Sequence, residues 1–267
     1  MNSLPQRAAS LLGERVVRTT RLHGGDLYEV HFLHLASGAT AVAKTGPRAA
    51  AEARMLAAIR DAGAPAPRVL GVGPDLLLIE ALEDRGGPAS AWRDLGRVLR
   101  KLHARIGPHY GWPEDHAFGP VAIDNQPSDH WPSFWAEHRL LSGLEELPAE
   151  IARRLEALAA RMGERLPARP AASLLHGDLW SGNVLGASGR ITGLIDPACY
   201  HGHAEVDLAM LALFGAPGDA FWEGYAASEP DLARRRPIYQ LWPALVHLRL
   251  FGSGYRGLVE RLLREAG

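Results

Sequence analysis

The chain has 267 residues, 47% of them hydrophobic and 22% charged, a composition typical of a soluble globular protein. Its 29 basic and 30 acidic residues give a formal net charge of −1, which argues against a nucleic-acid groove or an anionic membrane surface. The single cysteine, Cys199, excludes an internal disulfide framework, and no signal peptide or membrane-spanning run is recognisable, so we expect a cytoplasmic protein without nucleic-acid or membrane partners.

The first eighty residues are predicted to form a small β-rich lobe with one helix. Alternating or continuous apolar runs between turn residues predict strands at 16–22, 28–32, 40–44, 69–72 and 76–80. A helical pattern runs from Arg48 to about Ala62 and ends at Gly63, ahead of two prolines. We expect this lobe to span residues 1–82 and to bind nucleotide.

The remainder, residues 83–267, is predicted to be a larger, mainly helical lobe for catalysis and acceptor binding. Helical periodicity or composition is found at 92–105, 132–144, 148–166, 205–214, 220–227, 231–251 and 255–265. The fold class is therefore α+β with two lobes, the first β-rich and the second helical.

The run HGDLWSGN, residues 176–183, carries the strongest chemical signal. Asp178 stands five residues before Asn183, and Asp196 ends the apolar run 191–195, which is typical of a short buried strand. Protein kinases use this spacing for a base that accepts the hydroxyl proton, followed by two metal ligands. A polar turn would also suit these residue types, but the three spacings together favour phosphoryl transfer from ATP. Asp178 would be the base, and Asn183 and Asp196 would offer oxygen ligands to Mg²⁺.

Lys44 and Glu52 form a second candidate pair. Glu52 shares a helical face with the apolar Met55, Leu56 and Ile59, and an inward carboxylate is costly unless it is paired. Lys44, at the end of the preceding strand, is the obvious partner, which predicts a lysine that holds the ATP phosphates. The alternative is that Glu52 only complements the helix dipole.

Two further features could contact the nucleotide. Gly24 and Gly25, between two strands, could let backbone amides approach phosphates, although a hairpin would need such glycines as well. The backbone from Glu80 to Leu82, at the end of the last strand of the first lobe, could bond an adenine edge, or could be an ordinary strand exit. No GxxxxGK[ST] motif is present, so a Walker-type fold is not supported.

Supporting roles are predicted for residues around the catalytic run. Asp207 lies in an apolar helical stretch and needs donors, for which the backbone from His176 to Asp178 is suited. Trp180 could wall the acceptor site, although most tryptophans are core residues. His201 and His203 are typical of a turn rather than of a metal site, because no acid or cysteine stands at matching spacing.

Several segments together resemble the fructosamine kinase (ketosamine-3-kinase) family, which shares a protein-kinase-like fold with aminoglycoside phosphotransferases and choline kinases. The resemblance covers nearly the whole chain. The segments that carry it are HGDLWSGN, residues 195–215 (IDPACYHGHAEVDLAMLALFG), FGSGY at 251–255, residues 125–140 and the Gly-Trp pair at 111–112.

This resemblance implies ATP-dependent phosphorylation of the sugar 3-hydroxyl of small-molecule or protein-bound ketoamines such as fructosamine and ribulosamine, a deglycation or repair role. It implies the roles given above for Asp178, Asn183, Asp196, Lys44 and Glu52. Some family members carry a cysteine in the glycine loop that links subunits and responds to oxidation; here the loop reads HGGD, so we do not expect that redox switch. Nothing in the sequence demands more than a monomer, and we expect one. The alternatives are an aminoglycoside, choline or homoserine phosphotransferase, and a nucleotide-binding pseudokinase that serves as an interaction module.

Overall fold

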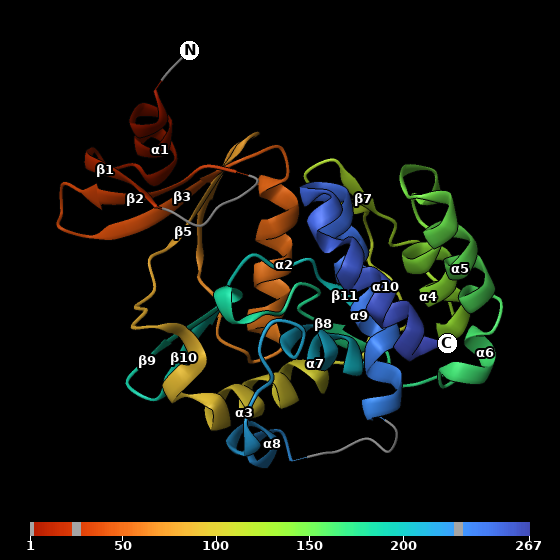
Figure 1. Cartoon of the computed structure of the whole chain (residues 1–267). Helices are drawn as coiled ribbons and strands as arrows, with labels where there is room; N and C mark the ends of the chain where they lie inside the picture. Colours follow the sequence, from red (N-terminus) through yellow and green to blue (C-terminus); the bar gives the residue numbers. More distant parts are fainter. Residues whose placement is uncertain (1–2, 23–27, 227–231) are drawn as a thin grey trace. The chain divides into compact units, whose positions relative to one another are not determined.

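The computed structural model describes residues 3–22, 28–226 and 232–267, and the chain divides into two compact units (Figure 1). Unit 1 comprises Met1–Ala91 and Val184–Pro197, and unit 2 comprises Trp92–Asn183 and Ala198–Gly267. A single division after residue 82 was expected. The segment 184–197 instead belongs with unit 1, because its hairpin bonds to residues 83–85: the Arg85 N–H donates to the Gly186 carbonyl at 2.8 Å.

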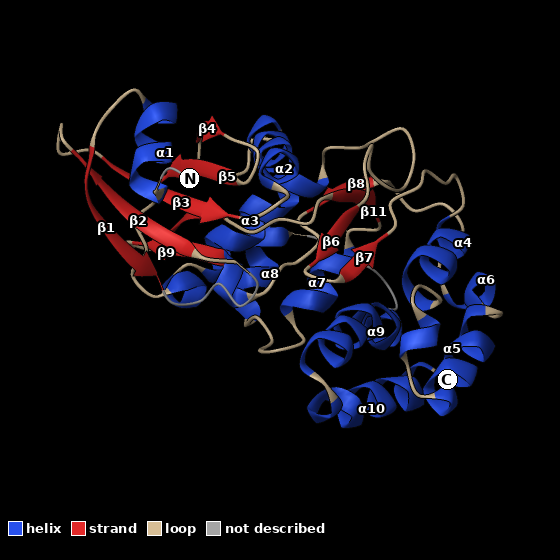
Figure 2. Cartoon of the chain, turned by 90° about the horizontal axis from the view of Figure 1, so that it is seen from above, coloured by secondary structure: helices blue, strands red, loops and turns tan. Residues whose placement is uncertain are grey.

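Unit 1 is built on one antiparallel sheet, drawn in red in Figure 2. Its strands lie in the order β1-β2-β3-β5-β4, so β1 and β4 are the edges. The bounds are β1 Val16–Leu22, β2 Val30–Leu35, β3 Thr40–Thr45, β4 Val69–Val72 and β5 Leu76–Glu80. The predicted strands are therefore all present within the described residues.

Strand alternation decides which residues of β3 face which helix. Ala41 and Ala43 are fully buried in a cluster with residues of β2 and β5 and with Ala8 of helix α1 (Leu4–Leu12). Because successive side chains point to opposite faces, Lys44 lies on the other face. Helix α2 (Ala49–Asp61) meets that face, and its Glu52 contacts Lys44.

Unit 1 is completed by a 3₁₀ turn at Gly87–Ser90 and by the hairpin of β9 (Val184–Ala187) and β10 (Arg190–Leu194). The hairpin turn uses left-handed backbone at Ser188 and Gly189 (φ 52° and 74°). The Thr192 hydroxyl donates to the Glu83 carbonyl at 2.6 Å, which ties the hairpin to the exit of β5. Asp196 follows β10 directly.

Unit 2 is mainly helical within the described residues, with two small two-stranded sheets, β6–β7 and β8–β11. The helices are α3 Trp92–His103, α4 Trp131–Trp135, α5 Ala149–Ala159, α6 Met162–Arg165, α7 Glu205–Leu211, α8 Asp219–Tyr225, α9 Leu232–Phe251 and α10 Arg256–Ala266. The strands are β6 His116–Phe118, β7 Val121–Ile123, β8 Ser173–Leu175 and β11 Tyr200–Gly202. The helix expected at 132–144 is α4 followed by a π-helical turn at Ala136–Leu140, and that expected at 148–166 breaks into α5 and α6.

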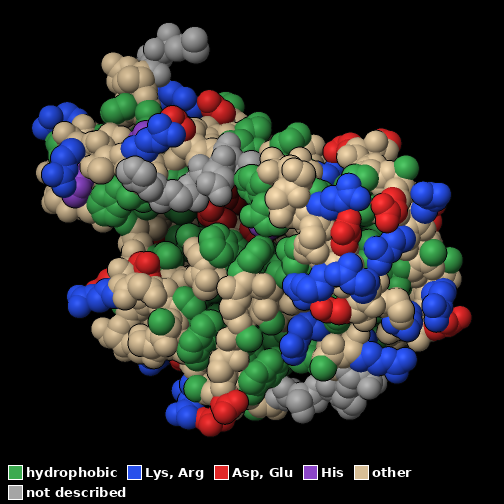
Figure 3. Space-filling model, viewed as in Figure 1, with side chains coloured by type: hydrophobic (Ala, Val, Ile, Leu, Met, Phe, Trp, Pro, Cys, Tyr) green, Lys and Arg blue, Asp and Glu red, His purple; other side chains and the backbone are tan. Residues whose placement is uncertain are grey.

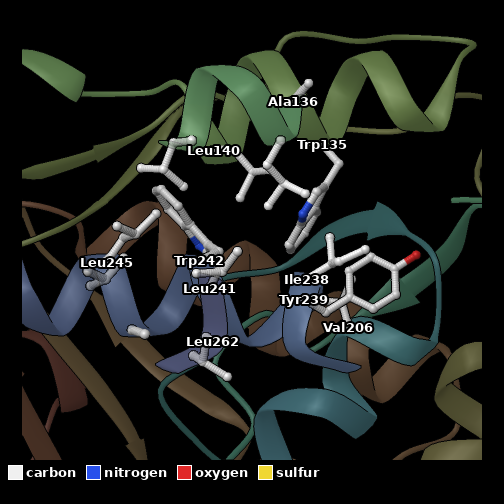
Figure 4. Close-up of a cluster of buried hydrophobic side chains, with 14 of the residues drawn as sticks. Trp135, Ala136, Leu140, Val206, Ile238, Tyr239, Leu241, Trp242, Leu245 and Leu262 are labelled. Carbon is white, nitrogen blue, oxygen red and sulfur yellow. The ribbon is translucent and has the colours of Figure 1, made fainter. Parts of the chain in front are cut away.

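Helix α9 lies at the centre of the core of unit 2. Figure 4 shows its Ile238, Tyr239 and Trp242 facing Trp135 and Leu140 from the segment around α4. Burial of each such side chain stabilises the fold by about 1.5–3 kcal/mol. The core explains why α9 is apolar around much of its circumference.

Three polar side chains of this core, those of Trp131, Tyr239 and His203, are linked to one another. The Trp131 indole N–H donates to the Tyr239 hydroxyl at 3.0 Å, and that hydroxyl lies 2.8 Å from His203 Nδ1. Burial, with the positive charges of Arg235 and His103, lowers the pKa of His203 to about 3, so the imidazole is neutral at physiological pH. His201 lies on strand β11 and not in the predicted turn, and its ring centroid lies 5.6 Å from that of Trp112, so these two histidines serve packing.

The surface of unit 2 over α5 and α10 carries interspersed basic and acidic side chains (Figure 3). Pairs such as Arg256–Glu260 and Arg261–Glu265 follow the helical i,i+4 spacing. Across the described ranges, no helix combines the length and apolar character that crossing a membrane requires.

Candidate functional site

Three charged side chains meet in unit 1. The Lys44 ammonium forms an ion pair with Glu52 Oε1 and another, at 2.6 Å, with Asp196 Oδ1. The Lys44 and Glu52 side chains are largely buried, whereas the Asp196 side chain is 41% exposed. The sequence predicts the pair of Lys44 with Glu52; the contact with Asp196 was not expected, because 152 residues separate the two positions.

This cluster contains two carboxylates, of Glu52 and Asp196, and one ammonium, of Lys44. Burial alone would lower the pKa of Lys44, but Glu52 and Asp196 outweigh it, so the pKa is raised and the ammonium stays charged. Burial and the neighbouring Asp196 carboxylate raise the pKa of Glu52 despite its pairing with Lys44. Two carboxylates facing one ammonium can therefore accept a further cation.

Asp196 is held in an unusual backbone conformation. Its φ of 55° lies in the left-handed region, which few non-glycine residues adopt and which Asp tolerates better than most. Such a residue costs of order 1 kcal/mol and persists only where the surroundings impose it. The local structure thus sets the direction of this carboxylate at some expense in stability.

The run that contains Asp178 is held by hydrogen bonds to Asp207, the third residue of α7. Asp207 is wholly buried and accepts hydrogen bonds from the backbone N–H of His176 at 2.7 Å and of Gly177 at 3.0 Å. Burial would raise the pKa of Asp207, but the bond from His103 and its charge outweigh that effect and lower it. The carboxylate is thus ionised, and it fixes the backbone just before Asp178, as the sequence predicts.

His103 extends this anchor into α3 and α8. Its Nε2 lies 3.1 Å from Asp207 Oδ2, and because a carboxylate only accepts, Nε2 carries the hydrogen. Its Nδ1 lies 2.9 Å from the Tyr225 hydroxyl. The two helices approach closely because each has a glycine against the backbone of the other. A Cβ added at Gly96 of α3 would lie 2.2 Å from the Phe221 carbonyl oxygen, and one added at Gly224 of α8 would lie 2.0 Å from the Arg93 carbonyl oxygen.

Gly177 is required by its surroundings. Its φ is 82°, and a Cβ at this position would lie 2.0 Å from the Ala198 carbonyl oxygen. The close approach comes from the β8–β11 pair, which continues as a bond from the Ala198 N–H to the His176 carbonyl at 2.9 Å. Only glycine fits between His176 and Asp178.

Asn183 is turned toward Asp178 by the 3₁₀ turn Ser181–Asn183. Its amide nitrogen donates to the Asp178 carbonyl at 2.8 Å and to the Asp178 carboxylate at 3.1 Å. Both acceptors force the amide group into one orientation, so the carbonyl oxygen Oδ1 is the atom that could ligate a metal. The buried Asn183 therefore orients the predicted base and presents an oxygen.

Trp180 lies over Gly182 on the same run. A Cβ at Gly182 would lie 2.2 Å from the indole ring, so the ring can occupy this position only because residue 182 has no side chain. Trp180 is 40% exposed, unlike the buried Trp131 and Trp135. An exposed aromatic face two residues after Asp178 fits the expected wall of an acceptor site.

The remaining predicted nucleotide contacts are Gly24, Gly25 and the backbone from Glu80 to Leu82. Gly24 and Gly25 lie outside the described residues. The Glu80 carboxylate bonds to Arg68 at 3.2 Å, and the Glu80 N–H donates to the Arg68 carbonyl, so Glu80 is engaged in strand pairing. No hydrogen bond from the described part of the chain occupies the backbone N–H or carbonyl of Leu82.

Some positioning residues were not found from the sequence. His103 falls in the apolar stripe of a predicted helix, and its pairing with the inward Asp207 was the available signal. Gly177 and Gly182 carry no sequence signal beyond their place in the motif, because what a Cβ would meet depends on the fold. The reciprocal glycines of α3 and α8 gave no sequence signal.

The oxygen donors fit a hard cation better than a soft one. Within residues 3–22, 28–226 and 232–267 no three His, Cys, Asp or Glu side chains gather as metal ligands. Magnesium usually takes one or two protein oxygens and completes its shell with phosphate and water. Asn183 Oδ1 and the half-exposed Asp196 carboxylate have the right chemistry.

Comparison with known proteins gives consistent results. The sequence model of the family described as Fructosamine kinase matches residues 6–266. A protein of Thermus thermophilus named Probable ketoamine kinase TTHA1179 is 36% identical over 248 residues, covering 91% of each chain.

Solved structures agree. A fructosamine-3-kinase candidate from Thermobifida fusca is 32% identical and aligns with a TM-score of 0.88 over 100% of this chain and 99% of its own. The aminoglycoside phosphotransferase APH(4)-Ia, solved with AMP-PNP and hygromycin B, aligns with a TM-score of 0.69 over 100% of this chain and 99% of its own. At 19% identity that likeness shows the protein-kinase-like fold alone.

Proposed function

The chain belongs to the fructosamine kinase family, and on that premise we propose that it transfers the γ-phosphoryl group of ATP to the sugar 3-hydroxyl of a ketoamine. Fructosamines and ribulosamines are the acceptors we expect, free or attached to protein. The phosphorylated product would release its amine, which is a repair of glycated amines.

One observation carries this proposal. Lys44 bridges Glu52 and Asp196, which joins a strand lysine, a helix glutamate and a strand-end aspartate in one cluster. Phosphotransferases of this fold use such a lysine to hold ATP phosphates and such an aspartate to hold magnesium. A merely structural lysine would have no need of a second, half-exposed carboxylate in a strained backbone conformation.

The residues would act by positioning and charge. Asp178 would accept the proton of the attacking hydroxyl and orient it, while Asn183 holds the Asp178 carboxylate through its amide. Asp207 and His103 keep the backbone ahead of Asp178 in place. Lys44 would draw the phosphates of ATP, and the free backbone groups of Leu82, with Gly24 and Gly25, would contact the nucleotide.

We assign magnesium ligation to Asn183 and Asp196 on the chemistry of their oxygens. The ion would neutralise charge on the phosphates when it is bound. Asp196 can take that role because its present partner, Lys44, retains Glu52.

The decisive experiment incubates the protein with ATP, Mg²⁺ and either fructose-lysine or ribulose-lysine, and follows the phosphorylated sugar by mass spectrometry. We expect turnover of at least one ketoamine, and none when the metal is chelated. Kanamycin and choline serve as alternative acceptors. Turnover of either, with none of the ketoamines, would overturn the assigned acceptor while leaving the kinase chemistry.

A cytoplasmic, monomeric enzyme without nucleic-acid or membrane partners remains our expectation from the sequence. Sedimentation velocity at micromolar concentration checks the oligomeric state. A dimer would correct the expectation without affecting the site.

A further inference from the structure

Four ring-bearing side chains gather on the surface of unit 2, where α9 ends. His247 lies at the centre, with ring centroids 5.2 Å from Phe214, 5.5 Å from Phe251 and 4.9 Å from Tyr255. Phe214 is 47% exposed and Phe251 is 48% exposed. We call these four residues the aromatic platform.

The platform is not a scatter of exposed apolar residues. Single exposed hydrophobic side chains are normal on a protein surface, whereas contiguous ones mark binding sites. Phe251 and Tyr255 also contact each other, with centroids 6.0 Å apart. Three rings around one imidazole therefore form a continuous surface.

Gly252 provides the turn after Phe251. Its φ of 82° and ψ of −162° belong to a region that essentially only glycine occupies. An added Cβ would meet nothing within 4 Å, so the backbone conformation, and not steric crowding, requires glycine at this position. From this turn the chain enters the 3₁₀ turn Ser253–Tyr255, whose last residue carries its ring beside His247.

His247 presents a hydrogen-bond acceptor among these rings. Its Nδ1 lies 2.7 Å from the Pro243 carbonyl, and because a carbonyl only accepts, Nδ1 carries the hydrogen. In the neutral ring Nε2 is then an acceptor, and within the described residues it has no hydrogen-bond partner. The platform thus combines π faces with one free nitrogen lone pair.

We propose that the aromatic platform binds the amine-bearing arm of the acceptor, its secondary ammonium group and the hydrocarbon chain beyond it. The inference rests on the proposed function and deepens it. Aromatic faces attract ammonium groups by about 0.5–2 kcal/mol, and a neutral imidazole can accept an N–H from the same group. A free sugar carries neither the cation nor the chain, so the platform would favour ketoamines over unmodified ketoses.

The position of the platform fits this role. Helix α7 begins beside the catalytic run, where Asp207 holds the backbone of His176 and Gly177. Phe214 lies three residues beyond Leu211, the last residue of α7, so only the rest of this helix and a short turn separate it from Asp207 in the chain. The platform therefore belongs to the segment that begins at the support of the catalytic run.

The test compares fructose-lysine with free fructose, which offers the same hydroxyl without the amine. In Phe251→Ala and His247→Ala we expect the KM for fructose-lysine to rise about tenfold, while the KM values for ATP and for fructose stay unchanged. Phe251→Leu keeps an apolar side chain without a π face and should give an intermediate rise. Ile106→Ala, at an apolar residue of unit 2 that is 52% exposed, is the matched control.

Binding of fructose-lysine without ATP, measured by calorimetry, should weaken in the same order and separates recognition from turnover. If no ketoamine is a substrate of the unaltered protein, the proposed function fails. If ketoamines are substrates but the platform variants bind them as before, or lose fructose equally, the platform proposal alone is overturned. Phe214→Ala, outside any helix, provides the same test should the Phe251 variants fold poorly.

Discussion

The two units hold their key carboxylates in opposite ways. In unit 1, Asp196 is half-exposed and is bonded to a side chain, Lys44, which also serves Glu52. In unit 2, Asp207 is fully buried and is bonded to two backbone N–H groups and to His103. Side-chain ion pairs can exchange partners when a new charge arrives, whereas a buried carboxylate on backbone donors fixes the path of the chain. Unit 1 is therefore suited to receive charge and unit 2 to hold geometry.

The largest effect is expected at Asp178, the predicted base, which follows the backbone that Asp207 holds in unit 2. Asp178→Asn should lower kcat for the ketoamine about 1000-fold, because an amide cannot accept the hydroxyl proton. The affinity for ATP should be unchanged, measured by titration calorimetry. Asp219→Asn, at the first turn of α8, is the control. A variant that retained a tenth of the activity would contradict the role of Asp178.

Asp207→Asn tests the claim that unit 2 depends on a buried carboxylate. An amide has only one acceptor oxygen, so its NH2 group would face one of the two backbone donors, and we expect the free energy of unfolding to fall by about 3 kcal/mol. Urea denaturation measures it, again with Asp219→Asn beside it. A loss below about 1 kcal/mol would mean that the hydrogen bonds to His176 and Gly177 are replaceable.

Lys44→Met tests the opposite expectation for unit 1. We expect kcat/KM for ATP to fall about 100-fold, because the phosphates lose their cation. The free energy of unfolding should fall by less than in Asp207→Asn, because Glu52, whose pKa is already raised, can take up a proton and Asp196 can be hydrated. A stability loss as large as that of Asp207→Asn would remove the contrast between the units.

The smallest effect concerns pH. The pKa of His203 is about 3 in the folded protein and about 6.5 when unfolded, so the unfolded state binds more protons between these values. Stability from the neutral ring is therefore complete above pH 6.5 and declines as the pH falls toward 3. Between pH 7 and pH 5 the protein should lose about 2 kcal/mol more than His203→Gln. Equal losses in urea titrations at the two pH values would show that His203 is not the group responsible.

Much of this architecture is predictable because local patterns and folded environment agree. The strands of unit 1 follow from alternation, and the pairing of Lys44 with Glu52 follows from the cost of an inward carboxylate. The bonds from Asp207 to the backbone near His176 follow from the same reasoning. At each of these positions the residue type itself indicates what kind of partner it requires in the folded chain.

The rest depends on contacts between distant segments. The bond between Lys44 and Asp196 needs the hairpin 184–194 to return to unit 1, which no local pattern indicates. The π-helical turn after α4 replaces a predicted regular helix, and buried Arg139 at that turn lies 4.3 Å from the centre of the Tyr200 ring. Tertiary packing there outweighs helical propensity.

The return of residues 184–197 to unit 1 has a consequence for biosynthesis. When Ala91 leaves the ribosome, unit 1 still lacks its last hairpin and Asp196, the second partner of Lys44. Translation at roughly 5–20 residues per second delays their arrival by about 5–20 s. During that interval Lys44 and Glu52 have only each other, and the sheet of unit 1 must stand without β9 and β10. Slowing translation between codons 92 and 184 would lengthen the exposure of this incomplete unit to chaperones and proteases.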